Sequence, residues 1–201
     1  MDARRSIDAP LKARRISLPN LLTYARIAAV PAVVACLLGG GDDARWLALG
    51  LFIAAGVTDF FDGFLARRWS QQSSLGRMLD PIADKLLVST CLLLLAADTD
   101  RTIAGWSLWA AIIILCREIL VSGLREYLAE LKVSVPVTRL AKWKTTIQMV
   151  AIAVLLAGPA LDKMVSYATE TGIALLWVSA LVTLYTGYDY FRAGVKHIVD
   201  E

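Results

Sequence analysis

Apolar residues occur along this chain in long blocks that are separated by short polar connections. Each block is close to the roughly 20 residues that a membrane-spanning helix requires. The blocks cover approximately 21–38, 46–67, 78–97, 104–125, 144–161 and 168–190. Polar stretches such as GGGDDAR and ADTDRT separate them, and glycines 39–41 form a helix breaker. The pattern predicts an all-α integral membrane protein with about six transmembrane helices.

Composition supports this prediction. The chain of 201 residues is 57% hydrophobic and 19% charged, with a mean hydropathy of +0.58. A soluble domain typically carries about 25% charged residues. We therefore predict one membrane domain over residues 19–201, preceded by a basic arm over residues 1–18. The arm is partly amphipathic and is expected to lie along the membrane surface.

The distribution of basic residues predicts the orientation. Only Arg45, Arg101 and Lys163 fall on the side opposite the N-terminus. The side of the N-terminus holds Arg4, Arg5, Lys12, Arg14, Arg15, Arg67, Arg68, Arg77, Arg125, Lys132, Arg139, Lys142, Lys144, Arg192 and Lys196. Positively charged loops stay in the cytoplasm, so both termini are expected there. The net charge of +3 is explained by this topology and by contact with anionic lipids, and nucleic-acid binding is not expected.

Four aspartates interrupt two of the apolar blocks, where an unpaired carboxylate is costly to bury. Asp59 and Asp62 are three residues apart, and Asp80 and Asp84 are four apart. Residues at these spacings share one face of a helix. The two helices run in opposite directions on either side of the loop RRWSQQSSLGR. Facing pairs would bring the four carboxylates together near the cytoplasmic surface.

Carboxylates this close repel one another and require a cation to stay ionised. The only histidine, His197, lies in the polar tail, so the ligands would be oxygens alone. Oxygen ligands favour Mg²⁺ or Mn²⁺, and Mg²⁺ is commonly shared with substrate phosphates. We therefore predict two divalent ions that clamp a diphosphate. A salt bridge or helix cap explains a single acid but not four. A cation or proton transporter is an alternative, although its acids would be expected at mid-membrane.

The spacing of the acidic segment also resembles a known signature. It reads Asp59-x-x-Asp62-Gly63-x-x-Ala66-Arg67, eight residues, Gly76, three residues, Asp80, three residues, Asp84. This is similar, at every defined position, to the signature of the CDP-alcohol phosphotransferases. Those membrane enzymes move a phosphatidyl or similar group from a CDP-linked donor to an alcohol and release CMP. The resemblance implies their all-helical membrane fold for this chain.

The resemblance also implies roles for individual residues. Asp59, Asp62 and Asp80 would hold the first metal ion, and Asp59, Asp80 and Asp84 the second. Asp84 would also be the general base that takes the proton of the acceptor hydroxyl. The segment PNLLT resembles the element of the family that closes over the nucleotide. The residues implied in binding the CDP donor are Asn20, Thr23, Gly63, Ala66, Arg67, Ser73 and Gly76.

The acceptor alcohol has to be inferred from residues outside the signature. Arg117 lies within an apolar block beside Glu118, and further cations follow it. The predicted acceptor-phosphate residues are Arg117, Arg125, Arg139, Lys142 and Lys144. Several cations near a diphosphate site suit an acceptor that carries a phosphate itself. The alternative for Arg125 and the two lysines is that these charges only follow the positive-inside rule.

A closer resemblance covers the chain from about residue 17 to the sixth block. The segments PNLLTxxRI, DFFDGFLARRWSQ, RE…S.LRE.LAEL and KxKTTxQM are similar to those of bacterial phosphatidylglycerophosphate synthases. This resemblance implies transfer of the phosphatidyl group from CDP-diacylglycerol to glycerol 3-phosphate. It also implies a homodimer in the bacterial inner membrane, with the active site facing the cytoplasm. Related alternatives are a cardiolipin synthase that accepts phosphatidylglycerol and an enzyme that uses inositol phosphate.

Overall fold

The computed structural model describes residues 18–69, 74–131 and 139–199, and within these ranges all regular structure is α-helical. The helices are α1 (Leu18–Gly39), α2 (Asp42–Trp69), α3 (Ser74–Ala97), α4 (Ser107–Glu130), α5 (Arg139–Leu161) and α6 (Ala168–Val199). The predicted all-α class is therefore confirmed, and each predicted block corresponds to one helix.

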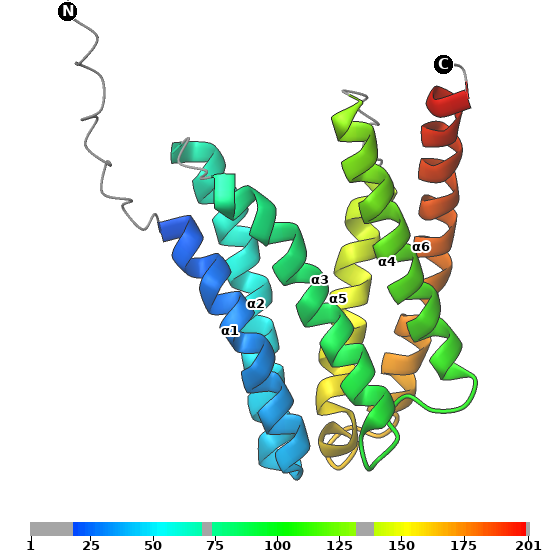
Figure 1. Ribbon diagram of the computed structural model, residues 1–201. Helices are drawn as coiled ribbons and strands as arrows, with labels where there is room; N and C mark the ends of the chain where they lie inside the picture. The colour runs from blue at the N-terminus through cyan, green and yellow to red at the C-terminus, as the bar shows by residue number, and fades with distance from the viewer. Residues whose placement is uncertain (1–17, 70–73, 132–138, 200–201) are drawn as a thin grey trace, which may run out of the picture.

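The six helices run up and down beside one another (Figure 1). We call one end of the bundle the N-terminal end: it holds the starts of α1, α3 and α5 and the ends of α2, α4 and α6. The opposite end, called the far end, holds the turns between α1 and α2, α3 and α4, and α5 and α6. Gly40 and Gly41 make the first of these turns with φ of 69° and 87°. These positive values suit glycine, which has no Cβ.

Four of the helices are long and apolar enough to cross a membrane, so the chain is a membrane protein. These segments are Leu21–Gly39, Ser107–Glu130, Trp143–Leu161 and Ala168–Arg192. The other two helices, α2 and α3, contain 28 and 24 residues and carry the four aspartates of the motif. At about 1.5 Å per residue their length suffices for a span. A total of six spans stays a prediction.

The helix ends differ by several residues from the apolar blocks. Helix α4 begins at Ser107 and continues to Glu130, while its apolar block covers 104–125. Gly105, with φ of 55°, lies in the turn before α4, and the chain becomes helical only after it. At the other end, backbone hydrogen bonds continue through polar residues, which hydropathy alone cannot register. Hydropathy therefore located the spans but not the full helices.

Helices α5 and α6 approach closely at two glycines. A Cβ added to Gly172 would lie 2.8 Å from the side chain of Leu155, and one added to Gly158 would lie 2.7 Å from Thr169 Oγ1. Small residues allow such close helix packing in membranes, where lipid competes with apolar contacts. Helix α5 also packs against α2 and α3, so it joins the first three helices to the last.

At the far end, the buried side chain of Arg45 forms hydrogen bonds to two other segments of the chain. Arg45 Nη2 donates hydrogen bonds to Asp98 Oδ2 at 2.5 Å and to Asp100 Oδ2 at 2.8 Å. Its Nη1 donates to the carbonyl of Leu156 at 3.3 Å. Asp98 also accepts hydrogen bonds from the backbone N–H and hydroxyl of Thr102, at 2.9 and 2.6 Å. These contacts connect the start of α2 to α5 and to the turn after α3.

A third far-end aspartate, Asp162, holds the start of α6. It accepts hydrogen bonds from the Thr169 hydroxyl at 2.5 Å and from the Thr169 backbone N–H at 3.0 Å. These bonds favour the ionised carboxylate and lower the pKa of Asp162 below its usual value, with the hydroxyl bond as the largest cause. Asp162 therefore satisfies donors that the first turn of a helix leaves without partners.

Candidate active site

Two aspartates from the predicted acidic pairs line the same cavity. Asp59 of α2 and Asp84 of α3 border a space of about 710 Å³, together with Arg26, Thr145 and Thr146. The remaining wall is apolar and consists of Phe52, Ile53, Ala55, Gly56, Val57, Leu87, Met149, Val150, Ala153 and Val154. We call this space the acid cavity. The cavity brings together one acid from each pair.

A third aspartate is held by the first helix. Asp80, half-buried on α3, accepts a hydrogen bond of 2.6 Å from the hydroxyl of Thr23 on α1. The sequence pointed to Thr23 as a donor-binding residue. In the structure its hydroxyl fixes the orientation of an acid of the motif, so α1 contributes to the acidic site through this contact.

Arg26 is a site residue that was not among the predicted ones. Its side chain is 1% exposed, and its Nη1 lies 2.7 Å from Oδ1 of Asp59, whose side chain is 51% exposed. The signal was present in the sequence, because Arg26 is the arginine of PNLLTxxRI and a lone charge inside an apolar block. Such a charge in a membrane helix marks a functional site unless it has only a structural partner.

The donor atoms around the acid cavity suit a hard cation. Asp59, Asp80 and Asp84 offer carboxylate oxygens from two helices, and Asp62 lies one turn after Asp59 on α2. The side chain of Asp62 is outside the described part of the structure. The described side chains alone do not assemble a cluster of three metal ligands. An oxygen-only ligand set from aspartates nonetheless fits Mg²⁺ or Mn²⁺ in its chemistry.

Two of the predicted acceptor cations meet at one glutamate. Lys144 Nζ of α5 contacts Glu118 Oε1 of α4, and Arg117 Nη1 lies 3.4 Å from the same oxygen. The charge of Glu118 acts on Asp84, and the charge of Asp84 acts on Lys144. We call Arg117, Glu118 and Lys144 the charged triad. Lys144 directly precedes Thr145, which lines the acid cavity, so this part of the predicted acceptor site lies next to that cavity in the chain.

The other predicted acceptor residues are not part of the charged triad. Arg125 is exposed on α4, and its guanidinium lies over the ring of Tyr190, 5.8 Å from the ring centroid. The structure thus places Arg125 against α6 and not with Lys144. Arg139 and Lys142 lie in the first turn of α5, as expected for the N-terminal end. Their side chains are outside the described part of the structure.

Most predicted donor residues lie on helices whose ends meet at the N-terminal end. Gly76 is buried near the start of α3. The structure places Asn20 on α1 and Gly63, Ala66 and Arg67 on α2, without describing their side-chain environment. Ser73 lies outside the described residues. The donor site therefore stays a prediction, apart from the contact of Thr23 with Asp80.

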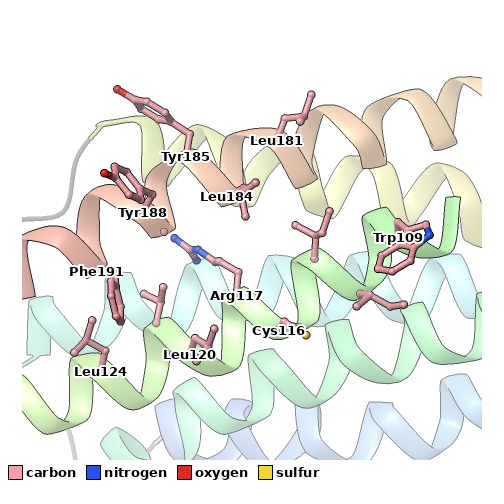
Figure 2. A pocket seen from close by; sticks show the side chains of 14 residues that line it. Trp109, Cys116, Arg117, Leu120, Leu124, Leu181, Leu184, Tyr185, Tyr188 and Phe191 are labelled. Atoms are coloured by element: carbon pink, nitrogen blue, oxygen red, sulfur yellow. The ribbon is translucent and has the colours of Figure 1, made fainter. Parts of the chain in front are cut away.

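A second cavity, between α4 and α6, is separate from the acid cavity. Its volume is about 760 Å³, and apolar side chains such as Leu120, Leu184, Tyr188 and Phe191 form most of its wall (Figure 2). Arg117 reaches into this groove between the two helices. Arg117 therefore faces α6, where its Nε donates a hydrogen bond to the carbonyl of Thr183 at 3.1 Å.

A bundle of membrane helices with acids of the motif around one cavity defines a class of membrane-embedded enzymes. The family model described as CDP-alcohol phosphatidyltransferase matches residues 16–185. The chain belongs to the CDP-alcohol phosphatidyltransferase family. The resemblance read from the acidic signature is thereby confirmed.

Several curated relatives share most of the chain, and each is named CDP-diacylglycerol–glycerol-3-phosphate 3-phosphatidyltransferase. The relative from Cereibacter sphaeroides is 41% identical over 92% of this chain and 98% of its own length. The one from Rickettsia bellii is 45% identical over 90% of this chain and 97% of its own. The one from Escherichia coli K12 is 40% identical over 93% of this chain and 100% of its own. The closer resemblance seen in the sequence is thus confirmed.

Proposed function

We propose that this membrane protein transfers the phosphatidyl group of CDP-diacylglycerol to glycerol 3-phosphate and releases CMP. The observation that carries the proposal is the acid cavity, which Asp59 and Asp84 line together with Thr145, the residue that follows Lys144 of the charged triad. The relatives described above are named for this reaction. An acidic site next to cations suits a reaction between a diphosphate donor and a phosphorylated acceptor.

Asp84 is the proposed general base. Its carboxylate lines the acid cavity, and Lys144 and Glu118 lie within electrostatic range of it. Asp84 accepts the proton of the primary hydroxyl of the acceptor as the oxygen attacks the donor phosphorus that carries diacylglycerol. A new P–O bond forms to glycerol 3-phosphate, and the P–O bond to CMP breaks. The electron pair of the broken bond leaves with CMP.

The aspartates of the motif are the proposed ligands of two Mg²⁺ or Mn²⁺ ions. Asp59, Asp62 and Asp80 would bind one ion, and Asp59, Asp80 and Asp84 the other. Bound there, divalent ions would neutralise the diphosphate and stabilise the negative charge on departing CMP. Thr23 orients Asp80 through its hydrogen bond of 2.6 Å.

The acyl chains and the CDP group of CDP-diacylglycerol need different surroundings. The apolar wall of the acid cavity, including Phe52, Ile53 and Leu87, suits the acyl chains. The proposed CDP-binding residues are Asn20, Thr23, Gly63, Ala66, Arg67, Ser73 and Gly76. The proposed residues for the phosphate of the acceptor are Lys144 and Arg117, with Arg125, Arg139 and Lys142 towards the N-terminal end.

The proposed cellular setting follows from the charge distribution. The N-terminal end of the bundle, with its basic connections, faces the cytoplasm by the positive-inside rule. Both water-soluble partners, glycerol 3-phosphate and CMP, would then exchange with the cytoplasm. The chain is proposed to act in the bacterial inner membrane and to form a homodimer.

The test is an acceptor assay with purified protein in detergent. CDP-diacylglycerol is supplied with glycerol 3-phosphate, phosphatidylglycerol or inositol phosphate, and CMP and the lipid product are measured. CMP formation with glycerol 3-phosphate is expected, to be abolished by EDTA and restored by Mg²⁺ or Mn²⁺. CMP formation only with another acceptor would contradict the proposal. Ion flux in liposomes without any CMP formation would instead support the transporter alternative.

A further inference from the structure

Glu118 occupies a position that the proposed reaction leaves without a role. Its side chain is 20% exposed, lies on α4, and contacts a cation on each side. Arg117 and Lys144, at 13% and 5% exposed, are the two cations. Both meet the same carboxylate oxygen, Oε1. A carboxylate shared by two sheltered cations is expensive to remove, because both would lose their counter-charge.

Arg117 is committed to helix α6. Its Nε donates to the carbonyl of Thr183 at 3.1 Å, and its Nη2 lies 3.3 Å from Thr186 Oγ1. Its aliphatic stem packs over Gly187, where an added Cβ would lie 3.0 Å from Arg117 Cγ. With Glu118 on Nη1, all three guanidinium nitrogens have protein partners. Arg117 therefore acts as an anchor between α4 and α6.

Lys144 differs from Arg117 in the use of its donors. An ammonium group carries three N–H donors. Among the described residues, the contact of Nζ is with Glu118 alone, which leaves donors available to a ligand. Lys144 directly precedes Thr145, which lines the acid cavity together with Asp84, the proposed base, and the charge of Asp84 acts on Lys144. The phosphate of an acceptor whose hydroxyl lies at Asp84 would thus find Lys144 within reach and Arg117 already engaged.

We propose that Glu118 is a positioning residue for the acceptor. Fixed by Arg117 against α6, Glu118 holds the ammonium of Lys144 beside Asp84, where it binds the phosphate of glycerol 3-phosphate. This inference rests on the proposed function, because it requires a phosphorylated acceptor. It also revises the proposed acceptor site: Lys144 binds the ligand, whereas Arg117 acts through Glu118 and does not itself bind the phosphate.

The test compares Glu118→Gln with the wild-type enzyme in the CMP assay. The amide has the size of the carboxylate but lacks its charge, so Lys144 is no longer held as firmly. The KM for glycerol 3-phosphate is expected to rise about tenfold, as befits a weakened charge-assisted hydrogen bond. The KM for CDP-diacylglycerol is expected to stay unchanged. Stabilisation of the folded protein by glycerol 3-phosphate, measured by thermal unfolding without donor, should shift to higher ligand concentration in parallel.

Two further variants control the interpretation. Glu126→Gln removes the same charge from an exposed position on the same helix and is expected to leave both KM values unchanged. Glu118→Asp keeps the charge but shortens the side chain, so it should fold readily and raise the KM for glycerol 3-phosphate by a smaller factor. If Glu118→Gln does not fold, Glu118→Asp decides the question by the same comparison of KM values.

The outcomes separate this inference from the proposed function. A wild-type enzyme active with glycerol 3-phosphate whose KM is unmoved by changes at Glu118 overturns the inference alone. Equal increases in both KM values, or lower thermal stability without a change in KM, also overturn it, since either result indicates a merely structural ion pair. A wild-type enzyme that forms CMP only with an unphosphorylated acceptor overturns the proposed function and this inference together.

Discussion

The two ends of the helix bundle use aspartates in different ways. At the far end, Asp98 accepts hydrogen bonds from both Arg45 and Thr102, and Asp162 accepts two from Thr169. At the N-terminal half, Asp59 and Asp84 border a cavity of about 710 Å³. Among the described contacts, Asp59 has an ion pair with Arg26, and Asp84 has no hydrogen-bond donor.

This difference shows how an acid in a membrane protein can be assigned to structure or to chemistry. Hydrogen-bond donors that surround a carboxylate stabilise its charged form, and the carboxylate in turn fixes the chain segments that supply those donors. A carboxylate that faces a cavity and is not saturated by donors keeps lone pairs for a cation or a proton. Asp98 and Asp162 belong to the first kind, and Asp59 and Asp84 to the second. The comparison predicts that substitutions at one end change stability and that those at the other change turnover.

The largest expected effect comes from Asp84→Asn. Loss of the proposed base should lower kcat by at least about 100-fold, within the range for general-base removal. Metal binding should be partly kept, because Asp59, Asp62 and Asp80 remain. CMP release with saturating substrates measures the change. Asp100→Asn, at the far end, is the matched control and should keep near-normal kcat. Near-normal activity of Asp84→Asn would exclude Asp84 as the base.

Arg45→Met tests the prediction that substitutions at the far end change stability. The variant leaves Asp98, whose side chain is 9% exposed, without its cation. Removal of one partner from a buried ion pair costs about 3–5 kcal/mol of folding free energy. Thermal unfolding in detergent should therefore show a clearly destabilised protein, while the folded fraction keeps its KM values. A stable variant with altered KM values would mean that the far end takes part in substrate binding.

Much of the fold could be predicted from hydropathy because lipid requires long apolar helices. The six apolar blocks correspond to α1–α6, and the glycines at 39–41 mark the first turn. The helix ends could not be predicted as well, since backbone hydrogen bonds continue into polar sequence at Glu130 and beyond residue 190. The close approach of α5 and α6 at Gly172 also depends on tertiary packing that a single sequence does not display.

The site was predictable only in part, for reasons of geometry. Helical spacing within each pair, and the antiparallel helices, placed Asp59 and Asp84 on one cavity. The sequence could not reveal that Arg117 bonds to α6 while Lys144 contacts Glu118 of α4, because both are simply cations near apolar residues. Arg26 could have been found by the reasoning applied to Arg117, since each is a charge within an apolar block.

A smaller effect, on the affinity for Mn²⁺, is expected for Arg26→Met at the acid cavity. Arg26 neutralises Asp59 at 2.7 Å and would compete with a divalent ion for that carboxylate. Its loss should tighten Mn²⁺ binding about fivefold, because an ion pair with one exposed partner contributes about 1 kcal/mol. Electron paramagnetic resonance of free Mn²⁺ gives the affinity without substrate. Arg101→Met removes an exposed far-end charge and should change nothing. Unchanged or weaker Mn²⁺ binding in Arg26→Met would contradict this role for Arg26.

The smallest expected effect is the loss of thermal stability in Asp162→Ala. Its dependence on pH distinguishes it from the other predicted effects. The hydroxyl and backbone N–H of Thr169 lower the pKa of Asp162, so the ionised carboxylate stabilises the folded state. That stabilisation is complete above the pKa of an unfolded aspartate, about 3.9, and is lost as the pH falls through the lower folded value. Asp162→Ala should therefore unfold at a lower temperature than wild type at about pH 6, with normal turnover, and the difference should shrink in acid. Asp189→Ala, at an exposed position on α6, provides the baseline. A difference that persists unchanged to the lowest pH would show that packing, and not the charge of Asp162, holds the start of α6.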